Sequence, residues 1–393
     1  MTATTTSGTA TGAGTRLVDV DDLDDIAAGA AVLGTGGGGD PYIARLLARQ
    51  SLRRHGPVLL VDPDDLTADA AVFPVGMMGA PTVMVEKLPG AEQAAQAVQT
   101  LARYLDRTPT HVTCTEISGL NALLPFVAAA ELGLPVLDAD GMGRAFPELQ
   151  MVLPSIYGLT ASPMSIADEK GNRGVFQTRD NGWAERLART ATVEMGCRAT
   201  ISLYAMTGAQ ARESLVLRSI SLAARVGARL RAARAAHTDP VAAVLDTLGG
   251  RELFAGTVVD VSRRTTGGFA RGTAVLHGVL TDADQPPAAR THEARMEFQN
   301  ENLLLSVARL GPGAGDERLL ATVPDLICTL AADTGAAITT EGLRYGQRVR
   351  VLAVPCDPRW TSAAGLELVG PRYFGYDVDP VTSARAETAV PSR

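Results

Sequence analysis

Acidic side chains follow two apolar runs in the first half of the sequence. Asp138 and Asp140 come at the end of one run, Glu116 comes at the end of another, and Glu148 follows the first pair after a short polar segment. Carboxylates that share a confined cleft repel each other, so one can hold a proton near neutral pH while its neighbour stays ionised. These four residues are therefore candidate catalytic groups, able to supply both a general acid and a general base. The alternative is that Asp138 and Asp140 only cap the following turn.

A run of glycines earlier in the chain is a candidate binding loop. Gly36, Gly37, Gly38 and Gly39 lead into Asp40, which stands where a helix is expected to begin. Bare backbone amides at a helix start bind anions such as carboxylates. These five residues are candidate substrate-binding groups, although a tight turn between domains would need the same glycines.

Three further polar residues are candidate substrate contacts. Arg144 could hold a substrate carboxylate or the charge that develops during a reaction, and Asn121 and Gln150 offer amides near the carboxylates.

A metal site is left open by the sequence. The five histidines lie far apart and no His-Glu-x-x-His motif occurs, so a zinc site built mainly on histidine is not expected. Glu116, Asp138 and Asp140 are the candidate ligands for a divalent metal such as zinc, and no other cofactor is predicted.

The glycine loop also admits a nucleotide interpretation. Residues 34–39 fit the pattern Gly-x-Gly-x-x-Gly. Asp62 follows this loop by about 20 residues, which is the spacing that a dinucleotide site requires. An NAD-dependent oxidoreductase is therefore the alternative function. The segment before the loop has a helical pattern rather than the strand that this fingerprint needs.

The elements that must position these residues alternate between helix and strand. Strands are expected at residues 57–61, 70–75, 111–117 and 134–138, and helices at 21–33, 40–54, 91–105 and 121–132. Continuous apolar strands that alternate with helices predict a mostly parallel sheet in a three-layer α/β domain. Ligands bind outside the carboxyl ends of such strands, so Glu116, Asp138 and Asp140 are expected to meet in one crevice with Met77 and Met78.

The second half of the chain has a different pattern. A long helix is predicted at residues 209–236, followed by short β-like segments at 256–261, 272–280, 294–298, 303–308 and 349–354. Turn signals between them predict an antiparallel sheet or barrel. The polar run 297–303 inside apolar strand indicates half-buried, hydrogen-bonded side chains, with structural and substrate-binding roles equally open.

Composition limits the organisation and the partners. A chain of 393 residues with 46% apolar residues suits two domains, which we place at residues 17–165 and 166–378 between disordered tails at 1–16 and 379–393. The net charge of −7 argues against nucleic acid as a partner, and no unbroken apolar stretch is long enough to span a membrane. Four widely spaced cysteines are typical of a cytoplasmic protein. The low charged content, 20%, and the arginines of the predicted long helix favour a homo-oligomer. The candidate site residues predict a small-molecule substrate.

Several of these motifs together resemble the S-methyl thiohydantoin desulfurase family over about residues 18–380. The resemblance rests on residues 36–42, 119–121, 138–151, 168–172, 263–269, 297–303 and 324–327.

This resemblance implies an N-terminal three-layer α/β domain, a C-terminal β-rich, barrel-like domain, and hydrolysis of a C–S bond in a five-membered ring. The expected reaction converts an S-methyl thiohydantoin to a hydantoin, and other cyclic amides are plausible substrates. A non-catalytic subunit of a hydantoinase-type complex is the remaining alternative.

Overall fold

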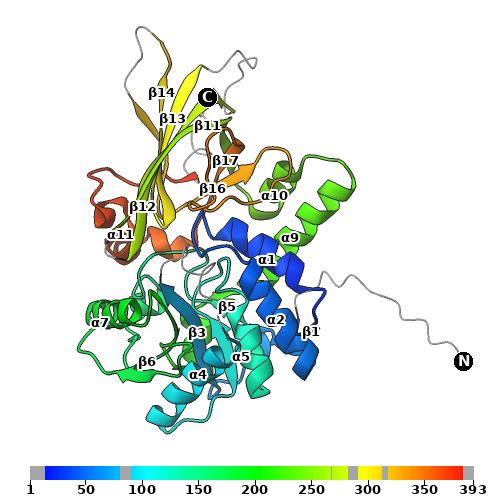
Figure 1. Cartoon of the computed structure of the whole chain (residues 1–393), viewed down its shortest axis with the longest axis vertical. Coiled ribbons are helices and arrows are strands. Elements are labelled where there is room, and N and C mark those ends of the chain that lie inside the picture. Colours follow the sequence, from blue (N-terminus) through cyan, green and yellow to red (C-terminus); the bar gives the residue numbers. More distant parts are fainter. Residues whose placement is uncertain (1–13, 80–89, 267, 282–290, 312–316, 384–393) are drawn as a thin grey trace, which may run out of the picture.

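The computed structural model describes residues 14–79, 90–266, 268–281, 291–311 and 317–383. It contains two β-sheets, one in each half of the chain, which lie end to end along the long axis (Figure 1). Most of the two predicted tails falls outside the described residues. Val381 and Ser383, inside the predicted C-terminal tail, hydrogen bond to Thr322 and Asp325 of the second half.

The first sheet is built around parallel strands. Its spatial order is β1 (Arg16–Val18), β2 (Val58–Val61), β5 (Val136–Asp140), β4 (His111–Cys114), β3 (Ala71–Gly79), β8 (Arg198–Ser202), β6 (Met164–Ala167) and β7 (Arg173–Phe176), with β10 (Val216–Leu217) beside β5 and β9 (Met206–Thr207) beside β3. The pairs β2–β5, β5–β4 and β4–β3 are parallel. The predicted parallel sheet is confirmed in the strands that carry the candidate site, and antiparallel strands extend it on both sides.

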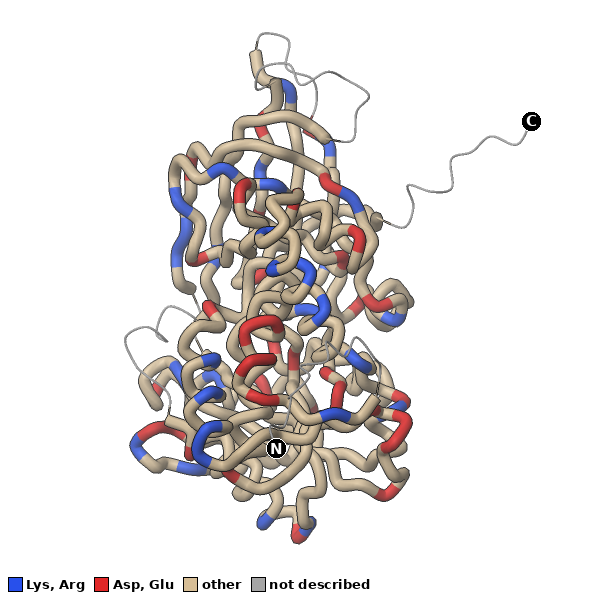
Figure 2. The backbone as a smooth tube through the Cα atoms, turned by 90° about the vertical axis from the view of Figure 1, so that its right-hand side faces the viewer, with Lys and Arg blue, Asp and Glu red and all other residues tan. Residues whose placement is uncertain are grey.

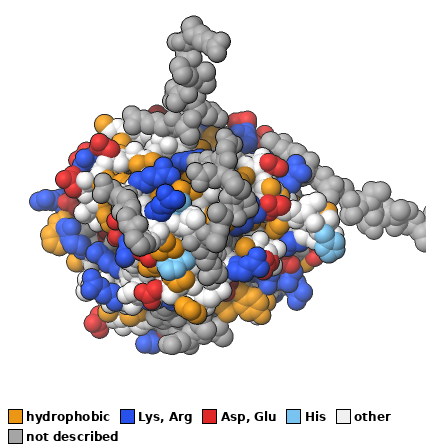
Figure 3. All heavy atoms as spheres, turned by 90° about the horizontal axis from the view of Figure 1, so that it is seen from above, with side chains coloured by type: hydrophobic (Ala, Val, Ile, Leu, Met, Phe, Trp, Pro, Cys, Tyr) orange, Lys and Arg blue, Asp and Glu red, His pale blue; other side chains and the backbone are white. Residues whose placement is uncertain are grey.

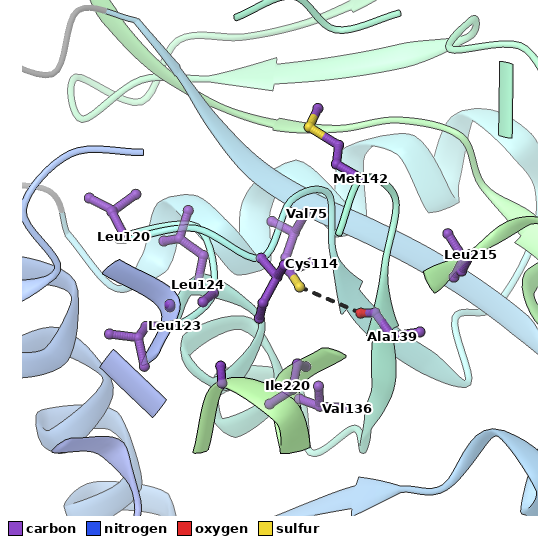
Figure 4. Packing of buried hydrophobic residues seen from close by; sticks show 14 of the residues in the cluster. Val75, Cys114, Leu120, Leu123, Leu124, Val136, Ala139, Met142, Leu215 and Ile220 are labelled. Atoms are coloured by element: carbon purple, nitrogen blue, oxygen red, sulfur yellow. Dashed lines mark hydrogen bonds between the residues drawn. The ribbon is translucent and has the colours of Figure 1, made fainter. Parts of the chain in front are cut away.

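Helices cover this sheet and form much of its core. They are α1 (Leu23–Leu33), α2 (Tyr42–His55), α4 (Glu92–Leu105), α5 (Leu124–Leu132), α6 (Leu153–Ile156), α7 (Asn181–Glu194), α8 (Gly208–Ser214), α9 (Ser219–Ala235) and α10 (Pro240–Leu248). Because parallel strands are apolar on both sides, the core includes Val75 of β3, Cys114 of β4 and Val136 of β5 with Ile220 of α9, as Figure 4 shows. The Cys114 thiol donates a hydrogen bond to the Ala139 carbonyl.

The sequence marks the ends of α5 clearly. Proline occupies its first turn, where the missing N–H costs nothing. Gly133 follows its last residue in the left-handed conformation that favours glycine, with φ of 67°. This helix contacts β3 and β4, the strands that lead to the candidate site.

The second sheet is antiparallel and curled. Its order is β15 (Arg318–Thr322), β14 (Glu301–Arg309), β13 (His292–Gln299), β12 (Phe269–Leu280), β11 (Arg251–Thr266), β17 (Arg348–Val354) and β16 (Leu326–Ala331). The short 3₁₀ segments η1 (Pro63–Asp65), η2 (Pro358–Thr361) and η3 (Pro371–Phe374) and the helix α11 (Ala363–Val369) complete the described elements. The predicted β-rich second part is confirmed.

The two predicted domains divide the chain differently from the two sheets. The boundary at residue 165 falls inside β6, and the later strands β7 and β8 also belong to the first sheet. The sequence predicts no strands in this segment, and the boundary is placed where the pattern of alternating helices and strands stops. The division at residue 165 stays a prediction, and the second sheet begins only at Arg251.

The prediction of a single long helix at residues 209–236 is wrong, because this segment forms two helices, α8 and α9, with the short strand β10 between them. Val216 and Leu217 pair with Asp140 and Ala139 of β5. Arg218 then takes a left-handed conformation, with φ of 61°. Its guanidinium forms ion pairs with Asp64 of η1 and with Asp62, the residue that caps η1. A tertiary strand pairing thus overrides the local helical pattern.

The arginines of α9 are partly engaged within the molecule. Helices α1 and α9 cross closely, since a Cβ on Gly29 or Gly227 would meet backbone of the other helix at 1.8 and 1.9 Å. Arg231 pairs with Asp25 across this crossing. Acidic and basic residues therefore interleave on the side of the molecule seen in Figure 2.

Seen from above the view of Figure 1, the molecule shows side chains of both charges with apolar side chains between them (Figure 3). No helix in the described part of the chain is both long and apolar enough to cross a bilayer.

Candidate functional site

A pocket lies at the carboxyl ends of β3, β4 and β5, where the first sheet meets the tip of the β13–β14 hairpin. This is the edge at which ligands of parallel sheets bind. Its polar lining comprises Thr115, Glu116, Asn121, Glu148, Arg189, Arg198, Asn300 and Glu301, and its remaining lining includes Gly38, Gly39, Met77, Met78, Leu120, Met142, Phe146, Leu149 and Ile201.

Glu116 is the acid of the first sheet that faces this pocket. It follows β4 by two residues and is 8% exposed. Its Oε1 accepts hydrogen bonds from Asn121 Nδ2 at 2.6 Å and from Ser118 Oγ at 2.7 Å. Burial raises the pKa of Glu116 to about 7, although these two hydrogen bonds oppose the rise. Glu116 can therefore exchange a proton near neutral pH.

Glu301 brings a second acid to the pocket from the other half of the chain. It is the first residue of β14 and is 3% exposed, and its Oε2 is buried without a hydrogen-bond partner in the described structure. Burial raises its pKa well above the ordinary range, and the nearby charge of Glu116 raises it further, while Arg144 lowers it. Two buried acids that raise each other's cost of ionisation favour a state with one proton between them.

The hairpin turn that precedes Glu301 is held rigidly. Asn300 takes a left-handed conformation, with φ of 59°. Its amide N–H and side-chain Oδ1 pair with the carbonyl and N–H of Ala270 at 2.7 and 2.8 Å. Its carbonyl accepts a hydrogen bond from the Thr340 hydroxyl. The position of Glu301 therefore follows from the fold of the second sheet.

The glycine loop joins the two halves of the chain beside this pocket. The carbonyls of Thr35 and Gly36 accept hydrogen bonds from the amides of Asn302 and Thr340, each at 2.8 Å. A Cβ on Gly37 would lie 2.0 Å from Oε1 of Glu301, and one on Gly38 would lie 2.2 Å from the Ser118 hydroxyl. Glycine is therefore needed at position 37 for the approach of Glu301, and at position 38 for the approach of Ser118, which hydrogen bonds to Glu116.

Only part of the loop reaches the pocket. Gly38 and Gly39 line it, and within the described residues their amide N–H groups donate no hydrogen bond. Gly36 and Gly37 pack against the second half instead. The Asp40 carboxylate accepts a hydrogen bond from the amide of Tyr42 at the start of α2 and does not line the pocket.

Asp138 and Asp140 do not meet Glu116 in the pocket. Side chains two apart on a strand share a face, and here that face is turned toward α9. Asp138 Oδ1 accepts a hydrogen bond from the Ser221 amide at 3.0 Å, which caps this helix. Burial raises the pKa of Asp138. The expectation that Asp138 serves the reaction is not supported by its position.

Asp140 organises the turn that carries the pocket wall. Its Oδ2 accepts hydrogen bonds from the amides of Ile117, Met142 and Gly143 at 2.8 to 3.0 Å. The residue is fully buried, and burial raises its pKa to about 6. The capping alternative therefore describes Asp140 better than a catalytic role, because its carboxylate is bonded to backbone and does not line the pocket.

Arg144 also lies outside the pocket. Its guanidinium is fully buried and donates to the carbonyls of Pro324 and Asp325 at 2.7 and 2.6 Å and to the Thr35 hydroxyl at 3.0 Å. It lies over the ring of Phe146 at 4.5 Å. Arg144 therefore binds the two halves of the chain together instead of holding a substrate anion.

Glu148 lines the pocket, whereas Gln150 does not. Glu148 Oε2 accepts hydrogen bonds from Gln150 Nε2 and, at 2.7 Å, from the Tyr373 hydroxyl. Asn121 is a pocket residue whose Oδ1 accepts a hydrogen bond from the Met77 amide at 2.7 Å. Asn121 therefore fixes both Glu116 and the end of β3.

Comparisons with known proteins agree with this architecture. The model of the S-Me-THD-like N-terminal domain matches residues 21–178, and that of the S-Me-THD-like C-terminal domain matches residues 179–382. The chain belongs to the S-Me-THD-like family.

An X-ray crystal structure of a protein from Chromobacterium violaceum, a structural genomics target, has the same fold as this S-Me-THD-like chain. The match has a TM-score of 0.75 and 24% identity, and it covers 93% of this chain and 99% of that one. No curated protein matches the chain.

Two arginines line the pocket of this S-Me-THD-like protein that the sequence did not single out. Arg189 of α7 pairs with Glu185 at 2.7 Å, donates to the Pro147 carbonyl and lies over the ring of Phe269 at 4.5 Å. Arg198 of β8 is 2% exposed and lies 3.7 Å from Glu169. Neither belongs to a motif identified in the sequence, and the strands used to locate the site all precede α7 and β8.

Glu301 was missed for a different reason. The polar run 297–303 identified its segment, but nothing in the sequence shows that a strand from the second half enters a pocket of the first. The unusual feature was an acid between two asparagines within an apolar strand.

The described residues do not fit the metal centre that the sequence left open. No group of three or more His, Cys, Asp or Glu side chains in this part of the chain is placed to hold an ion. Of the candidate ligands, Asp138 binds a backbone amide of α9, Asp140 binds backbone amides of the turns after β4 and β5, and only Glu116 lines the pocket.

The dinucleotide interpretation also lacks its structural context. The glycine loop follows helix α1, where the fingerprint requires a strand. Asp62, the acid expected to bind a ribose, is engaged by the guanidinium of Arg218 at 2.6 Å.

Proposed function

We propose that this protein hydrolyses the C–S bond of a small S-methyl thiohydantoin, releasing methanethiol and a hydantoin. The observation that carries the proposal is the pair of buried acids, Glu116 and Glu301, in one pocket. The family to which the chain belongs supports the ring type. The pocket walls of Met77, Met142 and Phe146 are soft and apolar, which suits a methylthio group.

The first step adds water to the ring carbon that bears sulfur. The Glu116 carboxylate takes a proton from the water as its oxygen attacks that carbon. Glu301 gives its proton to the ring nitrogen as the C=N bond becomes single. The product is a tetrahedral intermediate that bears one hydroxyl group and the methylthio group.

The second step expels the thiol. The hydroxyl proton returns to Glu301 as the C=O bond forms, the C–S bond breaks with its electron pair on sulfur, and Glu116 protonates the leaving methanethiolate. Both acids recover their starting states, and the two protons of water end in the thiol and, through Glu301, on the ring nitrogen.

Neighbouring groups prepare these two acids. Asn121 and Ser118 orient the Glu116 carboxylate, and Arg144 supplies positive charge near Glu301 without leaving its structural bonds. The unbonded amides of Gly38 and Gly39 are donors for charge that develops on the substrate. Burial of all these groups strengthens each electrostatic interaction.

Methanethiol release from an S-methyl thiohydantoin tests this function. Glu116→Gln and Glu301→Gln should each lower the rate by about 10²–10⁴, the usual loss for a positioned acid or base. Glu297→Gln is the matched control, because Glu297 is a half-buried acid of the same hairpin that does not line this pocket.

Either of two results would overturn the assignment. One is full turnover by both folded pocket variants. The other is a folded wild-type protein that releases no thiol from any such ring but copurifies with a hydantoinase-type enzyme, which would favour a non-catalytic subunit.

A homo-oligomeric state and a cytoplasmic location remain part of the proposal. The low charged content and the isolated cysteines support them, and sedimentation velocity of the purified chain would measure the first directly.

A further inference from the structure

A second cleft lies on the second sheet, on the side opposite its hydrophobic core. Ala274 and Met296 point into that core, so their strand neighbours point out of it. The cleft is lined by Ser262, Arg264, Arg271, Thr273, Glu297 and Gln299, with Phe374 and Tyr376 among its other lining residues.

Strand register places two arginines side by side in this cleft. Arg264 of β11 stands directly opposite Arg271 of β12. Like charges at opposed positions are destabilising. Within the described part of the chain, neither guanidinium has a carboxylate at ion-pair distance, although the structure contains many arginine–carboxylate pairs elsewhere. The cleft therefore carries two guanidinium groups without an ion pair in the described residues, against the single carboxylate of Glu297.

A buried amide adds an unused hydrogen-bonding group. Gln299 is the neighbour of Arg271 on β13 and is 6% exposed, yet in the described structure its side chain makes no hydrogen bond. Although the residue as a whole is largely buried, its side-chain oxygen and nitrogen are not enclosed away from solvent, so the amide is open to a ligand. Its exposed edge opens into the cleft.

Two hydroxyl groups complete the donor set. Ser262 and Thr273 are opposed residues in the next row of the sheet, and neither makes a side-chain hydrogen bond within the described residues. The acid of the cleft, Glu297, is already engaged, since its Oε2 accepts a hydrogen bond from the Tyr376 hydroxyl at 2.9 Å. Two guanidinium groups, one amide and two hydroxyls thus line the cleft together, and its one carboxylate, that of Glu297, is hydrogen bonded to Tyr376.

We propose that this cleft binds a phosphate group, free or as a monoester, at a site separate from the Glu116–Glu301 pocket. Arginine pairs match tetrahedral oxyanions because each guanidinium offers parallel N–H donors. A bound phosphate relieves the repulsion between Arg264 and Arg271 and can accept a hydrogen bond from the Gln299 amide. The site does not depend on the reaction proposed above, and its test requires no turnover.

Calorimetric titration of the full chain with inorganic phosphate tests this site, in chloride buffers of matched ionic strength. The wild-type protein should bind one phosphate per chain, with affinity that falls as sodium chloride is added. Arg264→Gln and Arg271→Gln should each weaken binding by about tenfold or more, as expected for the loss of a charge-assisted hydrogen bond. A parallel titration with phenyl phosphate distinguishes the two sources, because only a monoester can also contact the rings of Phe374 and Tyr376.

Two further variants keep the test decisive. Arg309→Gln removes an exposed arginine of the same sheet outside the cleft and should leave binding unchanged. Thr273→Val removes one hydroxyl at nearly constant shape and should weaken phosphate while the protein stays folded. The proposal is wrong if neither phosphate nor phenyl phosphate binds, or if Arg309→Gln weakens binding as much as the cleft variants do.

Discussion

The environment of Glu116 decides how a carboxylic acid can act near neutral pH. Burial raises its pKa to about 7, and Asn121 and Ser118 limit that rise by donating hydrogen bonds to one oxygen. Burial raises the pKa of Glu301 well above its ordinary value, and Glu301 lines the same pocket. The residue with the lower pKa is the one that is ionised near neutral pH, so Glu116 acts as the base and Glu301 holds the proton.

The pH dependence of catalysis follows from this assignment. Glu116 must be ionised to act as base, so kcat/KM should rise about tenfold per pH unit below 7 and level off above it. It should fall again at higher pH, when Glu301 loses its proton. A pH–rate profile for methanethiol release measures both limbs, and a rate that falls steadily as the pH rises through 7 would reverse the two roles.

The same shift has a consequence for stability. Glu116 in the folded protein holds its proton up to about pH 7, whereas in the unfolded chain it loses it near its ordinary value of 4.5. The folded state therefore binds more protons between these values, and this residue's contribution to stability falls as the pH rises through that window.

Glu116→Gln should remove this penalty. The variant should match the wild type near pH 4 and be more stable at pH 7 or above, by up to about 3 kcal/mol. Urea unfolding at several pH values measures the difference. A variant that is less stable than the wild type at pH 7 and unchanged at pH 4 would show that the ionised carboxylate stabilises the fold.

At the scale of elements, the end of β5 distinguishes a structural acid from a catalytic one. Asp138 faces α9 and caps it through the Ser221 amide. Asp138→Ala should therefore cost about 1 kcal/mol of unfolding free energy, the usual value of a helix cap, and should retain turnover. Thermal unfolding and thiol release measured on one sample separate the two effects. A folded but inactive Asp138→Ala protein would show that Asp138 takes part in the reaction.

The sequence predicted the elements around the site better than it predicted which side chains meet. Most of the first-half helices and strands lie within a few residues of their predicted bounds, because their apolar periodicity reflects the faces they bury. The expectation that ligands bind at the carboxyl ends of parallel strands correctly located Glu116, Met77 and Met78 at the pocket. It could not show that Asp138 and Asp140 point to the other face, because their partners on α9 and in the turn are set by tertiary packing.

Residues of the second half were beyond the reach of this reasoning. Glu301 enters the pocket from β14, and its segment was recognised only as polar residues in an apolar strand. The break between α8 and α9 depends on the pairing of Val216 and Leu217 with β5, which a local helical pattern cannot reveal.

At the scale of the whole molecule, the pocket exists only where the two sheets meet. Arg144 holds this junction by donating to Pro324, Asp325 and the Thr35 hydroxyl from a fully buried position. Removing a buried donor leaves its acceptors without partners, which costs more than the net value of the bonds.

Arg144→Gln should therefore lower the free energy of unfolding by about 2–4 kcal/mol. Arg231→Gln is the matched control, because Arg231 forms an exposed pair with Asp25 that should contribute no more than about 1 kcal/mol. Denaturant unfolding compares them, and equal losses in the two variants would show that Arg144 does not secure the junction.

The central claim is that water activated at Glu116 attacks the ring carbon that bears sulfur. The final position of the water oxygen tests this claim most directly. Turnover of an S-methyl thiohydantoin in water labelled with oxygen-18, followed by mass spectrometry, identifies the atom that water attacks. Attack at the ring carbon by water activated at Glu116 places one labelled oxygen in the hydantoin carbonyl and releases unlabelled methanethiol. Labelled methanol with a sulfur-retaining ring would instead show attack at the methyl carbon and would contradict this account.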